Sequence, residues 1–278
     1  MDTIIQILAR ELGRSEAHVE NVVRLIDEGN TIPFIARYRK ELHGAMDDTA
    51  LRTLADRLQY LRNLDKRREE VKSAIEGQGK LTEELSAAID AAATLAEVED
   101  LYRPYRQKRR TRATVAREKG LEPLAELLFA QAADGPAPEE AAGAFVDPEK
   151  GVETAEDALQ GASDIIAERI SDDADIRKRL RELVWKKGYL VSAAAAKEPE
   201  DTVYRLYYAF RSPLNRVQGH QVLAINRGER EGVLKVSVEM EREAALIPVR
   251  RAVLNPGAPA MAFVRAAAED AYDRLIFP

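Results

Sequence analysis

Cysteine is absent from this chain of 278 residues. The absence excludes disulfides, thiolate metal ligands and a cysteine nucleophile, and it is typical of a reducing compartment, so we expect a cytoplasmic protein. The sequence also has no run of about 18 apolar residues and no basic segment followed by an apolar run at its start. We therefore expect neither a membrane span nor a signal peptide.

Motifs for catalysis are also missing. The histidines His18, His43 and His220 are isolated, and none has the spacing of a pair of metal ligands. No glycine-rich phosphate loop and no Gly-x-Ser-x-Gly motif is present. Neighbouring acids such as Asp47 and Asp48 would point about 100° apart on a helix, which is typical of helix starts and exposed faces. We expect a chain that is not an enzyme and has no metal site and no cofactor.

Residues that interrupt helices are few, with 15 glycines and 12 prolines, whereas alanine, leucine, glutamate and arginine are common. Because these four are strong helix formers, the composition favours a mainly α fold. Apolar residues recur at helical spacing through 47–76 without a breaker, which predicts one long helix. Branched and aromatic residues at 189–192, 203–208 and 232–238 predict a few short strands near residues 189–238.

The length exceeds that of a usual single domain, so we expect two folded lobes. We place an N-terminal helical domain at residues 1–125 and a second helical lobe, with the short strands, at 126–254. A C-terminal helix is expected at 255–278.

A basic connector lies at residues 103–119 of a chain whose net charge is −6. It has eight basic residues and one acidic residue, Glu118. Because Lys and Arg neutralise phosphates and tyrosine rings stack on bases, the connector has the chemistry of a nucleic-acid contact. The candidate contact residues are Lys108, Arg109, Arg110, Arg112, Arg103, Arg106 and Tyr105.

The same connector allows a structural explanation. Arginines between helices also bind carboxylates and helix carbonyls, and 48 acidic residues are available as partners. Burial of the guanidinium groups of Arg109, Arg110 and Arg112 against carboxylates would favour internal bracing, whereas joint exposure to solvent would favour contact with a partner. The sequence leaves both interpretations open.

A second candidate is the helix predicted at 218–230. In a helix-turn-helix such a helix enters the major groove, and Gln221, Asn226 and Arg227 are residue types that read base edges. An ordinary amphipathic helix has the same pattern, so this segment also keeps two interpretations.

Four segments form an ordered set along the chain: 28–41 (EGNTIPFIARYRKE), 78–82 (QGKLT), 97–125 (EVEDLYRPYRQKRRTRATVAREKGLEPLA) and 222–229 (VLAINRGE). Together they resemble signatures of the Tex family of bacterial transcription accessory proteins. The resemblance extends over essentially the whole chain and corresponds to the N-terminal part of the family's architecture.

The resemblance implies an elongated multi-helix array with an embedded helix-turn-helix-like module. Full-length members continue into a ribonuclease H-like domain of the YqgF type, a helix-hairpin-helix region and an OB-fold RNA-binding domain. None of these is visible here, so we expect a truncated chain. Nucleic-acid binding in the family is attributed chiefly to the OB-fold domain, and Lys108 to Arg112 correspond to the family's Lys-Arg-Arg-Thr-Arg.

We therefore expect the non-catalytic helical scaffold of a Tex-like transcription accessory protein, with an auxiliary nucleic-acid surface, acting in transcription or RNA metabolism. The expected partners are RNA or DNA and the transcription machinery, and no membrane. The alternative is a docking module that binds other domains or proteins and has no nucleic-acid binding of its own.

Overall fold

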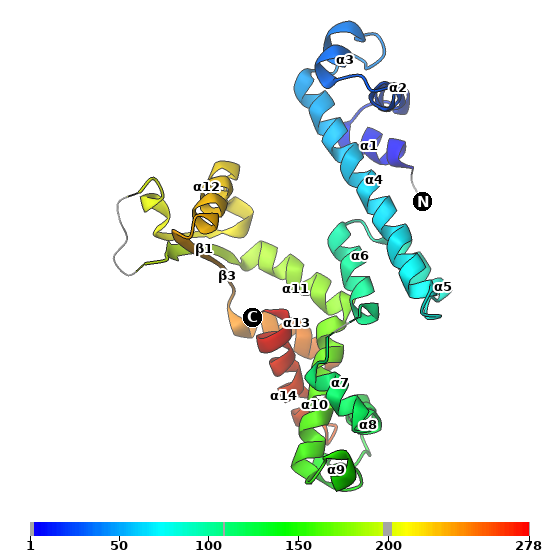
Figure 1. Ribbon diagram of the computed structural model, residues 1–278, viewed down its shortest axis with the longest axis vertical. Coiled ribbons are helices and arrows are strands. Elements are labelled where there is room, and N and C mark those ends of the chain that lie inside the picture. The colour runs from blue at the N-terminus through cyan, green and yellow to red at the C-terminus, as the bar shows by residue number, and fades with distance from the viewer. Residues whose placement is uncertain (1–2, 108, 197–201, 278) are drawn as a thin grey trace. The chain divides into compact units, whose positions relative to one another are not determined.

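The structure, a computed structural model (Figure 1), describes residues 3–107, 109–196 and 202–277. It divides into two compact units, Met1–Tyr105 and Arg106–Pro278. Helices dominate both units, which confirms the mainly α fold class, and the strands described are short and lie within 189–239. No helix in the described ranges is long and apolar enough to cross a membrane.

The first unit is built from helices. Its described elements are α1 (Ile4–Leu12), α2 (Glu16–Asp27), α3 (Ile32–Tyr38), α4 (Asp48–Glu76), α5 (Glu83–Ala91), α6 (Leu95–Tyr102) and the 3-10 turn η1 (Arg103–Tyr105). The helix predicted at 47–76 is confirmed as α4, which begins where the Asp47 carboxylate accepts a hydrogen bond from the Ala50 amide at 2.7 Å. Its leucines, from Leu51 to Leu64, form a buried stripe against which α1, α3 and α6 pack.

The second unit is organised around one buried helix. Its helices are α7 (Arg112–Glu118), α8 (Glu122–Ala130), α9 (Pro138–Gly143), α10 (Ala155–Asp172), α11 (Ala174–Lys187), α12 (Gly219–Arg230), α13 (Arg242–Val253), α14 (Met261–Asp270) and the π-helical turn η5 (Ala271–Ile276). The remaining short turns are η2 (Pro148–Lys150), η3 (Arg205–Tyr207) and η4 (Leu214–Arg216). α10 is covered by α7, α8, α9, α14 and η5. Because α7 and α8 pack on α10, the division between the units falls at Tyr105, whereas the sequence placed it at residue 125.

A small antiparallel sheet interrupts the helices of the second unit. β1 (Tyr189–Ala194) lies between β2 (Ala209–Pro213) and β3 (Leu234–Glu239). α12 packs on one face of this sheet, where the methyl groups of Leu234 occupy the space beside Gly228; a Cβ there would lie 2.7 Å from the nearest of them. The strand predicted at 203–208 is wrong. That segment turns as η3 because the Tyr204 side chain is buried against α12 and its hydroxyl donates to Glu231 at 2.9 Å.

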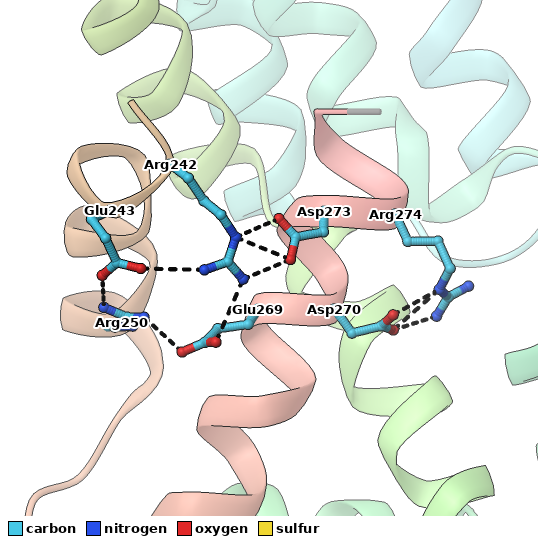
Figure 2. A network of polar contacts seen from close by, with 7 residues as sticks. All are labelled: Arg242, Glu243, Arg250, Glu269, Asp270, Asp273 and Arg274. Carbon is cyan, nitrogen blue, oxygen red and sulfur yellow. Dashed lines mark hydrogen bonds and ion pairs between the residues drawn. The ribbon is translucent and has the colours of Figure 1, made fainter. Parts of the chain in front are cut away.

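Charged residues connect the last helices of the second unit. The network in Figure 2 comprises Arg242, Glu243, Arg250, Glu269, Asp270, Asp273 and Arg274. Arg242 donates to Asp273 at 2.6 Å and links α13 to η5, and Arg250 donates to Glu269 at 2.6 Å and links α13 to α14. The chain's single tryptophan, Trp185, lies outside this packing near the end of α11 and is 60% exposed.

Candidate functional site

The connector runs into α7, and one acidic residue of α10 holds this helix in place. The Thr111 side chain caps α7 by accepting a hydrogen bond from the Thr114 amide at 3.0 Å, and its hydroxyl contacts the Glu168 carboxylate at 3.0 Å. Arg117, in the last turn of α7, donates to the other oxygen of Glu168 at 2.7 Å. The Glu168 side chain is only 11% exposed, so both ends of α7 are bound to a nearly buried carboxylate.

Arg117 braces the helix. Burial lowers the pKa of Arg117, but the hydrogen bond and charge of Glu168 outweigh burial, and its pKa lies above the usual value. Ala113 and Ala116 face the same side and are buried against the second-unit core. The inner side of α7 is therefore fixed by packing and by a charge-assisted hydrogen bond.

The three candidate arginines at the start of α7 are exposed. Arg109, Arg110 and Arg112 all have solvent-accessible side chains. Arg110 donates to Glu118 at 2.8 Å, yet its side chain remains 70% exposed, so the pair is a surface ion pair that stabilises by about 1 kcal/mol at most. In the part of the chain that the structure describes, no carboxylate pairs with Arg109 or Arg112. The guanidinium groups are therefore exposed together and not buried against carboxylates, which favours contact with a partner over internal bracing.

The other connector candidates are divided between the units. Arg103 lies in η1 of the first unit and is half-buried. Tyr105 packs against the first-unit core, and its carbonyl accepts a hydrogen bond from Gln78 at 3.0 Å. Arg106 begins the second unit and is exposed, whereas Lys108 lies outside the described residues. Among the described candidates, only Arg109, Arg110 and Arg112 lie together at the start of α7.

The second sequence candidate, α12, occurs in a setting that differs from a helix-turn-helix. It follows β2 and the 3-10 turn η4 and precedes β3, and among the described elements the preceding α-helix, α11, is separated from it by two strands. Gln221 is partly buried and closes the start of the helix by accepting a hydrogen bond from the Gln218 amide at 2.9 Å. Asn226 and Arg227 are exposed, with Arg227 paired to Glu231 at 3.2 Å. Base reading by this helix stays a prediction.

The chain matches two family models. Residues 2–76 match the Tex-like protein N-terminal domain, and residues 134–273 match the Tex central region-like family. The second match alone covers half of the chain.

The chain belongs to the Tex family.

Relatives of this Tex-family chain occur in bacteria and in humans. It is 44% identical to the YdcI protein of Bacillus subtilis (strain 168) over 98% of its own length and 38% of that protein. It is 40% identical to the transcriptional accessory protein Tex of Neisseria gonorrhoeae over 86% of its length and 31% of that protein. The human S1 RNA-binding domain-containing protein 1 is 30% identical over 99% of the chain and 29% of its own length. The chain thus spans about a third of the curated relatives that it matches.

Sequence reasoning missed the residues that position the connector of this Tex-family chain. Thr111 before a helical segment is an N-cap pattern that could have been noted. Glu168 carries no such local signal, because it lies 57 residues after Thr111 and 51 after Arg117. Only the packing of α7 on α10 brings the three side chains together.

Proposed function

We propose that this Tex-family chain is a non-catalytic helical scaffold of a transcription accessory protein, and that Arg109, Arg110 and Arg112 contact the phosphate backbone of nucleic acid. The observation that carries the proposal is that these three arginines are exposed together at the start of α7, a helix whose buried side is held to α10 by hydrogen bonds to Glu168. Arginine forks suit phosphate oxygens, and a presented set of them gives affinity without sequence preference.

Two features support contact with a partner over bracing within the chain. The bracing interactions in this region are made by Thr111, Arg117 and Lys119, the last donating to the Gly151 carbonyl at 2.7 Å. The exposed arginines are therefore not needed to attach α7. One relative has a name that refers to an S1 RNA-binding domain, and another is named for transcription, which agrees with nucleic acid as the ligand.

The test is binding of a fluorescein-labelled oligonucleotide to the chain over a series of salt concentrations. Single-stranded RNA, single-stranded DNA and duplex DNA are compared by fluorescence anisotropy. Replacing Arg109, Arg110 and Arg112 together with Ala should weaken binding at low salt by at least about tenfold and reduce the salt slope by about 2, because three phosphate contacts are lost.

The matched control removes three positive charges elsewhere. Arg24, Lys66 and Arg52 have highly exposed side chains and form exposed ion pairs with carboxylates four residues away. Their replacement by Ala removes the same number of positive charges as the connector variant. Equal weakening in the control would indicate a diffuse charge effect and contradict a localised contact. No binding at low salt would reject the proposal and leave the docking module as the function of the connector.

A further inference from the structure

A second basic surface lies in the second unit, away from the connector in sequence. A pocket of about 970 Å³ is lined by residues from the end of α11, from all three strands and from the start of α13. Its charged lining consists of Lys186, Lys187, Arg211 and Arg216 with Glu239 and Glu241. Positive charge therefore exceeds negative charge in a chain that is acidic as a whole.

A tight corner of the backbone builds this pocket. Gly188 ends α11, and its carbonyl accepts a hydrogen bond from the Leu214 amide at 3.0 Å, which attaches η4 beside the helix end. A Cβ on Gly188 would lie 2.5 Å from the Val184 carbonyl oxygen and 3.1 Å from a Leu214 methyl group. The close approach allowed by glycine thus brings η4, with Arg216, next to the two lysines of α11.

Three of the pocket's cations form no ion pair with a carboxylate of the described residues. Lys186, Lys187 and Arg216 are exposed, and no carboxylate within the described ranges forms an ion pair with any of them. On neighbouring α13, by contrast, Arg242 and Arg250 are each paired with two or more carboxylates. The uncompensated charge is therefore concentrated at the pocket, where an anion would find it unneutralised.

The sheet adds an arginine–tyrosine pair to this charge. The Arg211 guanidinium lies 3.5 Å from the centre of the Tyr189 ring, on the face of the sheet opposite to the one that carries Leu234 and α12. The Arg211 side chain is 54% exposed, and its nitrogen lies 3.4 Å from a carboxylate oxygen of Glu239. A guanidinium plane supported by a ring presents its outer face for stacking by a nucleobase.

We propose that this pocket binds a segment of single-stranded nucleic acid, with Lys186, Lys187 and Arg216 on the phosphates and a base stacked on Arg211. A pocket of this volume admits a flexible strand, whereas a duplex would present only its backbone at the rim. An acidic peptide would use the charges but not the stacking plane. This proposal rests on residues other than those of the connector, so the experiments can reject either proposal without rejecting the other.

The experiment uses the same anisotropy assay, with an oligouridine of about 12 nucleotides and a matched abasic strand as probes. Replacing Lys186, Lys187 and Arg216 with Ala should weaken oligouridine binding by at least about tenfold and reduce the salt slope by about 2. The Arg211→Lys variant keeps the charge but loses the plane, so it should weaken oligouridine binding by roughly fivefold and leave abasic-strand binding unchanged. Polyglutamate should compete poorly.

Several results would overturn the proposal. One is that the variant lacking Lys186, Lys187 and Arg216 binds oligouridine as tightly as the wild type does. Another is that Arg211→Lys weakens the binding of both probes equally. A third is that polyglutamate competes for the protein as well as unlabelled oligouridine does. The variant that lacks Arg109, Arg110 and Arg112 is measured in parallel. If the connector variant binds no nucleic acid and the pocket variant binds as tightly as the wild type, the contact lies at the connector and the pocket proposal is wrong. Because Lys186, Lys187 and Arg216 are exposed and form no ion pair with a described residue, circular dichroism of the pocket variant should show an unchanged fold.

Discussion

Glu168 is the residue on which the presentation of the connector depends. Its two oxygens accept hydrogen bonds from residues at both ends of α7, and it does so from a position that is almost closed to solvent. A nearly buried carboxylate needs such partners, since an unpaired charge in that position would be costly. The position of the exposed arginines of the connector thus depends on the hydrogen bonds of Glu168 on the buried side of α7.

Replacing Glu168 with Ala should lower the free energy of unfolding of the second unit by about 2 kcal/mol, because Arg117 would be left partly buried without its main partner. Urea unfolding followed by circular dichroism measures the change. Glu122 is the control. It is 54% exposed and contacts the same arginine at 3.3 Å, so its replacement by Ala should cost less than about 0.5 kcal/mol. Equal effects of the two substitutions would show that Glu168 has no special role.

At the scale of elements, the charge network of Figure 2 joins α13 to α14 and η5. We expect the stability of this packing to depend on pH. The hydrogen bond from Arg242 is the main reason that the pKa of Asp273 lies below its ordinary value of 3.8, with burial opposing the shift. A carboxyl group whose pKa is lowered in the folded state stabilises that state above its unfolded pKa. It loses this contribution as the pH falls through the folded pKa.

The Asp273→Asn variant should therefore be less stable than the wild type at neutral pH, and the difference should shrink as the pH falls below about 4. Urea titrations at several pH values give the two curves. Because the pair is about half exposed, added salt should reduce the difference at neutral pH. Asp134→Asn, in an exposed loop, is expected to leave the curve unchanged. A constant difference between Asp273→Asn and wild type at all pH values would contradict the role of this ion pair.

At the scale of the whole molecule, the described residues form two separate hydrophobic cores. Within the described residues, one core cluster lies between Leu8 and Val98 and the other between Ala113 and Tyr272. No residue belongs to both, and the boundary between the units, after Tyr105, lies within the connector. Each unit therefore has a hydrophobic core of its own, which is the main requirement for a separate cooperative unfolding transition.

Replacing the fully buried Leu54 with Ala should destabilise the first unit by about 3 kcal/mol and leave the transition of the second unit in place. Ile166→Ala, in the other core, should have the reverse effect. Scanning calorimetry of both variants separates the two transitions. A single transition that shifts equally in both variants would show that the units unfold as one.

The sequence predicts structure well where the signal is local. The apolar spacing of α4 and its Asp47 cap define that helix almost to the residue. The same reasoning misplaced a strand at 203–208, because the turn there is set by contacts of Tyr204 with the distant α12. The basic connector was recognised from charge alone, whereas its exposure depends on non-local packing. In the sequence, Lys186 and Lys187 resemble ordinary charges at a helix end, and only the folded chain places Arg211 of β2 and Arg216 of η4 beside them.

The exposed position of Trp185 decides which optical signal can follow these transitions. An indole that is already largely in water has an emission spectrum close to that of the unfolded chain, so its fluorescence would change little on denaturation. The first unit contains no tryptophan, so its unfolding would give no change in tryptophan fluorescence. Trp185 precedes Lys186, a residue of the pocket lining, in the chain. If the pocket binds single-stranded nucleic acid as proposed, we expect a base bound beside Lys186 to quench the emission of Trp185, and this change needs no label.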